Sequence, residues 1–196
     1  RSTKACQAVS PTSGIDAAWH MSSEAGFGAM SASLIAIASA KLPMRILLWH
    51  GYLLGGTGSN VYSRALAREW SRGGHEVVVV SQERAPEQYD LGGAQAVDVD
   101  LPGRLLPVFV MDRYEGLKPK LLQDFSEAER RAYIEANAAA LRALLPADLV
   151  FTNHVLMGGP VGAASGTPFR VKAHGSELEY SIRGRPELGE WARETL

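Results

Sequence analysis

The chain has 196 residues, enough for one ordinary domain with a tail, and its 46% apolar content allows a core of normal size. A net charge of −1 gives no bulk electrostatic reason to expect a nucleic acid or an anionic membrane as partner. No stretch approaches the roughly 18 to 20 apolar residues that cross a bilayer. The single Cys6 rules out an intrachain disulfide, which fits a cytoplasmic protein.

Residues 1–43 differ from the rest of the chain, because they are rich in Ser, Ala and Gly and show no sustained period. Gly26 to Ala40, which ends in Ala-Ser-Ala, resembles the apolar core and cleavage site of a signal peptide. The basic region that should precede such a core is missing, and Glu24 stands in its place. We therefore expect residues 1–43 to be an extension, either disordered or upstream of a natural start at Met44.

From Met44 the sequence predicts a strand, a turn, a helix and a second strand. Residues 45–50 (RILLWH) are an apolar run too short for a helix, which indicates a strand buried on both faces. A glycine-rich turn follows, and residues 60–72 have the apolar spacing of a helix, with Ser59 or Asn60 as its N-cap. Residues 76–81 (EVVVVS) predict the second strand, so this segment is a βαβ unit with parallel strands.

The remaining chain alternates between predicted strands and helices. Short apolar runs predict strands at residues 94–101, 106–111, 148–152 and 169–173. Residues 126–145 predict a long helix, because Ser126 and Glu129 form a capping box and Pro146 closes the pattern. The Gly- and Ala-rich segment between the last two strands has room for another helix. The expected fold is α/β, a doubly wound, Rossmann-like parallel sheet.

Three loops follow the carboxyl ends of predicted strands, where open parallel sheets bind ligands. The first, residues 50–60, is glycine-rich and leads into a helix N-terminus, which favours phosphate; a tight turn that requires glycine is the alternative interpretation. The second begins with Asn153-His154, and the third begins with His174 and contains Glu177. Imidazole donates, accepts and titrates near neutral pH, but a histidine at a strand end also serves as a structural hydrogen-bonding group. No third ligand joins His174 and Glu177 at a recognisable spacing, so we expect no metal site.

Three segments stand in a characteristic order: MRILLWHGYLLGGTGSNVYSRALAREWSRGGHEVVVVS, then ADLVFTNHVLMGG, then PFRVKAHGSELEY. Together they cover Met44 to about Tyr180 and resemble the N-terminal, acceptor-side domain of family 4 glycosyltransferases, the large retaining GT-B group. The resemblance implies transfer of a hexose from a nucleoside-diphosphate sugar, the co-substrate, to an acceptor hydroxyl. The anomeric configuration is retained, and no metal or other cofactor is obligatory.

The same resemblance implies roles for individual residues. Those expected to approach the donor diphosphate lie before and at the start of the first helix: Gly55, Gly56, Ser59 and Asn60. His174 is expected to be catalytic, beside the transferred sugar near the reacting centre. Those expected to line the acceptor side follow the later strands: Asn153, His154 and Glu177.

The family also implies a C-terminal domain that carries a Glu-x₇-Glu segment and the diphosphate-binding Arg and Lys. We expect that domain to be missing from this chain, together with the end of the N-terminal domain, because Leu196 falls within a predicted helix. Residues 44–196 are then an incomplete acceptor-side domain that is inactive alone. Two alternatives stay open: a dinucleotide-binding Rossmann protein, which the imperfect glycine pattern disfavours, and a non-catalytic truncated α/β module.

The acceptor stays open among a sugar, a lipid-linked molecule and a small molecule. Residues 103–124 carry four basic side chains among apolar ones. This pattern fits a phosphorylated or lipid-linked acceptor, or peripheral contact with a membrane, but a solvated basic edge is the simpler interpretation.

Overall fold

The computed structural model describes residues 42–195, and most of its elements follow the predicted order. The helices and strands are β1 (Arg45–Trp49), α2 (Gly58–Arg72), β2 (Glu76–Ser81), β3 (Gln95–Asp98), β4 (Leu105–Val108), β5 (Lys118–Leu121), α3 (Glu127–Ala143), β6 (Leu149–Asn153), α4 (Gly159–Ala164), β7 (Phe169–Lys172), α5 (Gly175–Glu177) and α6 (Pro186–Glu194). Two π-helical turns, η4 (His154–Gly158) and η5 (Leu178–Ile182), follow β6 and α5. The signal-like segment, and all of the expected extension except Leu42 and Pro43, lie outside the described residues.

Five parallel strands form the central sheet in the order β3-β2-β1-β6-β7. The chain moves outward from β1 through β2 and β3, and then returns to the other side of β1 with β6 and β7. The switch point therefore lies between β1 and β6, where Trp49 pairs with Thr152. This topology confirms the predicted α/β, Rossmann-like sheet, in which the carboxyl ends beside the switch point are the usual ligand site.

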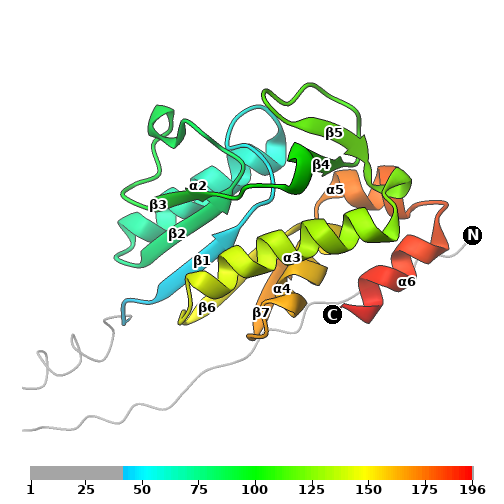
Figure 1. The fold of residues 1–196 in the computed structure, drawn as a ribbon. Helices are drawn as coiled ribbons and strands as arrows, with labels where there is room; N and C mark the ends of the chain where they lie inside the picture. Colours follow the sequence, from blue (N-terminus) through cyan, green and yellow to red (C-terminus); the bar gives the residue numbers. More distant parts are fainter. Residues whose placement is uncertain (1–41, 196) are drawn as a thin grey trace, which may run out of the picture. The chain divides into compact units, whose positions relative to one another are not determined.

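The apolar strands of the sheet are buried on both faces. Along β1, Leu47 and Trp49 join the core cluster that includes residues of α3, while Ile46 and Leu48 join the cluster that includes Ala67 of α2. Figure 1 shows these two helices on opposite faces of the sheet. Each fully buried Leu or Val contributes about 1.5 to 3 kcal/mol of hydrophobic stabilisation, which explains why β1 and β2 are continuous apolar runs.

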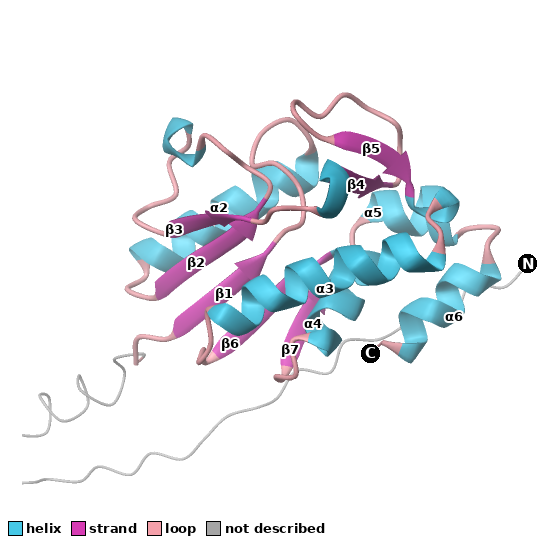
Figure 2. Ribbon diagram, in the orientation of Figure 1, coloured by secondary structure: helices cyan, strands magenta, loops and turns pink. Residues whose placement is uncertain are grey.

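A second, two-stranded sheet stands apart from the central one. The predicted strand at 106–111 is wrong at its end, because β4 stops at Val108 and pairs in parallel with β5 instead of joining the main sheet. The sequence did not indicate β5, since its four residues are KPKL, with two lysines and a proline. Figure 2 shows this small sheet beyond the carboxyl ends of the central strands.

The two long helices begin differently. The capping box of α3 is confirmed: the Ser126 hydroxyl accepts from the Glu129 N–H, and the Glu129 carboxylate accepts from the Ser126 N–H. The predicted cap of α2 is wrong, because the helix begins at Gly58 and Thr57 is the N-cap, without a side-chain hydrogen bond to the helix backbone. None of the helices among residues 42–195 is long and apolar enough to span a bilayer.

Candidate functional site

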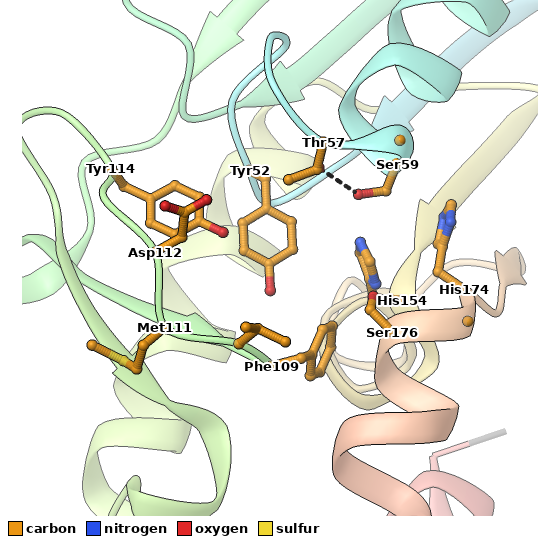
Figure 3. Close-up of a pocket in the computed structure, with 13 residues that line it drawn as sticks. Tyr52, Thr57, Ser59, Phe109, Met111, Asp112, Tyr114, His154, His174 and Ser176 are labelled. Carbon is orange, nitrogen blue, oxygen red and sulfur yellow. Dashed lines mark hydrogen bonds between the residues drawn. The ribbon is translucent and has the colours of Figure 1, made fainter.

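The loops that follow β1, β4, β6 and β7 meet around one pocket of about 440 Å³. Figure 3 shows His154 and His174 on one side of it, Thr57 and Ser59 at the start of α2, and Tyr52 and Phe109 between them and Met111. This pocket lies at the carboxyl edge of the sheet, as the ligand rule for open parallel sheets predicts.

A buried histidine ties the end of β1 to the first turns of α2. His50 is fully buried, its Nε2 lies 2.9 Å from the Asn60 Oδ1, and its Nδ1 lies 2.9 Å from the Ser63 Oγ. The Asn60 amide nitrogen donates to the Gly55 carbonyl, so the Asn60 oxygen must accept from His50. His50 therefore carries its proton on Nε2 and holds the glycine turn in place through Asn60.

A second amide orients the histidine after β7. The Asn153 Nδ2 donates to the Trp49 carbonyl over 3.1 Å, and its Oδ1 lies 2.9 Å from the Nε2 of His174. Because the amide nitrogen is used by β1, the amide oxygen accepts from His174, which carries its proton on Nε2. The neutral ring is then left with Nδ1 as its acceptor nitrogen.

Glu177 joins the loops that follow β6 and β7. Its side chain is fully buried, and its two oxygens accept from the Leu156 N–H at 3.0 Å and from the His174 N–H at 2.8 Å. Burial raises the pKa of Glu177 above its ordinary value, while these backbone N–H groups act in the opposite direction. The carboxylate is therefore a brace inside the protein and does not line the pocket.

His154 is the least satisfied polar group of the site. It is 1% exposed, and both of its ring nitrogens lack a hydrogen-bond partner among the described residues. Its backbone φ of 64° is unusual for a residue other than glycine, and it opens the π-helical turn η4. Buried unpartnered groups and strained backbone both cost free energy and gather at functional sites, so His154 is a strong candidate to meet a ligand.

The three histidines form a row of neutral rings. The ring centroids of His154 and His174 are 4.4 Å apart, and those of His50 and His154 are 6.1 Å apart. Burial lowers the pKa of His50 to about 4 and lowers the pKa of His154 well below its ordinary value. Burial, with Lys172 nearby, also lowers the pKa of His174. All three imidazoles are therefore neutral at pH 7.

Aromatic side chains line the pocket next to His154. The Tyr52 ring stacks on Tyr114 with centroids 6.0 Å apart, and the Phe109 ring lies 5.2 Å from His154. Tyr52 also meets His154 edge to face at 5.2 Å. Tyr52 comes from the loop after β1, whereas Phe109 and Tyr114 come from the loop between β4 and β5.

The glycosyl transferase 4-like domain model matches residues 57–196, which is most of the chain. The chain belongs to this family. Among solved structures, it is similar to the one titled "Crystal Structure of CalG4, the Calicheamicin Glycosyltransferase", at 22% identity with a TM-score of 0.40. The match covers 74% of this chain and 37% of that one, so the chain spans a little over a third of that structure's length. No curated protein matches the chain.

Of the eight residues predicted for this glycosyl transferase 4-like domain, three line the pocket: Ser59, His154 and His174. The other five do not line it: Gly55, Gly56, Asn60, Asn153 and Glu177. Asn60, Asn153 and Glu177 use their side chains on other parts of the protein, as described above. Within residues 42–195 no group of three His, Cys, Asp or Glu side chains could hold a metal ion.

Sequence reasoning missed two parts of this site. The aromatic side gave no signal, because its residues lie in loops without periodicity. The role of His50 did leave a trace, since Asn60 and Ser63 are three residues apart and therefore share one face of the helix that follows His50 in the chain.

Proposed function

We propose that this domain is the acceptor-side half of a retaining glycosyltransferase, which moves a hexose from a nucleoside-diphosphate sugar to an acceptor hydroxyl. The observation that carries the proposal is the meeting of an uncapped helix N-terminus and a neutral histidine at one pocket. The start of α2 and His174 both line it. The family of the chain supports the same reaction class.

The donor diphosphate would lie against the start of α2. Thr57 makes no capping hydrogen bond, and the first turn of α2 carries no acidic residue, so its backbone N–H groups are available to an anion. The preceding turn passes through Gly56 at a φ of +91°, a conformation that side chains other than glycine rarely adopt. Asn60 would support this turn through the Gly55 carbonyl instead of touching the donor.

His174 would contact the transferred sugar. It is half-buried, neutral at pH 7, and held by the Asn153 oxygen through Nε2, so its orientation is fixed before any ligand arrives. A neutral ring can lie against the sugar without competing with the diphosphate for a counterion. His154, beside it, would meet the acceptor, while Asn153 and Glu177 would position the two histidines.

The nucleotide would be held by a second domain across the cleft, and residues 44–196 alone would be inactive. The first acidic side chain after β2 supports this assignment over a dinucleotide-binding protein. Glu83 accepts from the Leu54 N–H and the Ala85 N–H, so this carboxylate is occupied by the protein and does not bind a ribose.

The test is transfer from a panel of nucleoside-diphosphate hexoses by the protein that carries both domains, compared with His174→Ala. We expect the substitution to lower kcat/KM by about 100-fold or more, because contacts at the reacting centre carry several kcal/mol. His75→Ala is the matched control, since His75 bonds the Met44 N–H before β1 and lies away from the pocket. NMR of the product should show the anomeric configuration of the donor.

Two results would contradict the proposal. One is a well-folded two-domain protein that neither binds nor turns over any sugar nucleotide, which would favour the non-catalytic module. The other is unchanged transfer after His174→Ala, which would remove His174 from the reacting centre. Inversion of the anomeric configuration would refute the retaining mechanism only.

A further inference from the structure

The wall of the pocket that extends from His154 toward Met111 is apolar. The rings of Tyr52, Phe109 and Tyr114 lie there, with the Tyr52 and Phe109 centroids 6.4 Å apart. Val110 and Met111 continue this side and are 51% and 55% exposed. Exposed apolar side chains at the rim of a pocket mark a surface that a ligand covers. Figure 3 shows Met111, Phe109 and Tyr52 around the open space that His154 faces from the other side.

The charges around the pocket disfavour an anionic acceptor. Among the described residues that line it, none is Lys or Arg, and Asp112 is the one acidic side chain. Two of the four basic residues of 103–124 are engaged by the protein: Arg104 donates to the Gly116 carbonyl, and Lys120 pairs with Glu129 at 2.8 Å. Arg113 borders a neighbouring open cavity instead. A phosphate placed against the aromatic side would therefore meet a carboxylate and no cation.

The histidine side can bind one hydroxyl group. His154 is buried, neutral and without a partner, so it offers one N–H donor and one acceptor nitrogen. A hydroxyl group can donate to the acceptor nitrogen or accept from the N–H group, so it gives the ring a hydrogen bond without bringing charge into the site. This match would also explain why a buried imidazole is left unpaired in the free protein.

We propose that the acceptor is an uncharged small molecule whose reacting hydroxyl is attached to a flat apolar ring system. The ring system packs against Tyr52, Phe109 and Met111, and the hydroxyl meets His154 beside His174. This inference rests on the proposed transferase function and adds the class of its acceptor. It excludes a phosphorylated sugar as the acceptor that packs against these aromatic side chains.

The test is binding to the 196-residue chain, measured by calorimetry at low salt with three probes. They are 2-naphthol, 2-naphthyl phosphate and methyl glucoside, which differ in charge and in apolar area. We expect 2-naphthol to bind, 2-naphthyl phosphate to bind about tenfold more weakly, and methyl glucoside not to bind measurably. Methyl glucoside has the hydroxyls but no apolar ring to pack.

Four variants locate the binding. Met111→Ala should weaken the binding of 2-naphthol about fivefold, because part of an apolar side chain is lost. The variant should fold, because Met111 is exposed. Asp112→Asn should reduce the ratio of the dissociation constants of 2-naphthyl phosphate and 2-naphthol about threefold, and added salt should reduce it in the same way. His154→Phe should weaken the binding of 2-naphthol but not the binding of 2-methylnaphthalene, which has no hydroxyl group. The control is Val61→Ala, which removes an exposed apolar side chain of α2 outside the pocket and should change nothing.

The inference is overturned if 2-naphthyl phosphate or methyl glucoside binds more tightly than 2-naphthol. It is also overturned if no probe binds the folded chain, or if Met111→Ala and Val61→Ala bind 2-naphthol with equal affinity. These results are separable from the transferase test. Transfer to a phosphorylated acceptor without naphthol binding would refute only the acceptor class, whereas naphthol binding in a two-domain protein that never transfers a sugar would refute the proposed function.

Discussion

The substitution Glu177→Gln tests whether the carboxylate brace holds the two histidine loops together. The side chain is fully buried, and its oxygens accept from the N–H groups of Leu156 and His174. In Gln one oxygen is replaced by an NH₂ group, which cannot accept, so one backbone N–H loses its partner. A buried N–H without a partner costs about 1 to 3 kcal/mol, and a charge-assisted hydrogen bond contributes a similar amount.

Part of this loss is offset, because a neutral amide is easier to bury than a carboxylate whose pKa is already raised by burial. We therefore expect a net loss of about 2 kcal/mol in the free energy of unfolding, a large fraction of a typical domain's stability. Urea unfolding at pH 7, followed by circular dichroism, measures it. The ¹⁵N chemical shifts of the His154 and His174 rings should also change, because their relative position depends on the brace.

Glu179→Gln is the matched control, two residues further along the chain. The Glu179 side chain is 55% exposed and pairs with Arg183 at the i,i+4 spacing, so its loss should cost only a few tenths of a kcal/mol. Equal losses for the two variants, with unchanged histidine shifts in both, would refute the reasoning about Glu177.

Three further predictions concern the same unit. His50 stays neutral in the folded chain down to a pKa of about 4, whereas the unfolded chain takes up its proton near 6.5; stability should therefore fall as pH falls from 6.5 to 4, by about 3 kcal/mol. The raised pKa of Glu177 makes the free energy of unfolding change with pH in the opposite direction. The check therefore compares urea unfolding of the native chain and of His50→Gln at several pH values. The same pH dependence in both proteins would contradict the prediction for His50. Gly162→Ala should cost about 1 to 3 kcal/mol, since a Cβ there would lie 2.4 Å from the Phe169 ring; Gly175→Ala, where a Cβ meets nothing within 4 Å, should be neutral, and equal melting temperatures would disprove the packing argument. Ser126→Ala should lower the free energy of unfolding by about 1 kcal/mol, because the capping box is lost. Glu127→Ala, which leaves the capping box intact, should not show this loss when its unfolding by urea is measured in the same way.

The sequence predicted most accurately the elements that are determined by residues close together in the chain. β2 has the predicted bounds, because EVVVVS is a continuous run of β-branched residues buried on both faces. The N-terminus of α3 also follows from its cap. The start of α2 was wrong by two residues, because Ser59 and Asn60 suit an N-cap, yet the Asn60 side chain is needed by His50.

The sequence predicted the candidate site only in part, for a physical reason. Strand ends placed His154 and His174 at one edge of the sheet, which needs only the parallel topology. The contact between Tyr52 and Tyr114 joins residues 62 positions apart through two loops, and no local propensity encodes such a contact. The unpaired state of His154 is likewise a property of its surroundings.

Apart from Tyr52, the apolar wall of the pocket belongs to a separate hydrogen-bonded unit, which affects how the protein can change over evolution. The histidines and Glu177 follow strands of the central sheet, whereas Phe109, Met111 and Tyr114 lie in the connection of the separate β4–β5 sheet. Insertions or substitutions in that connection would alter which molecules fit without disturbing the hydrogen bonds that orient His174. Under the proposed function, related chains would diverge in the acceptors that fit while the side that holds His174 stays the same.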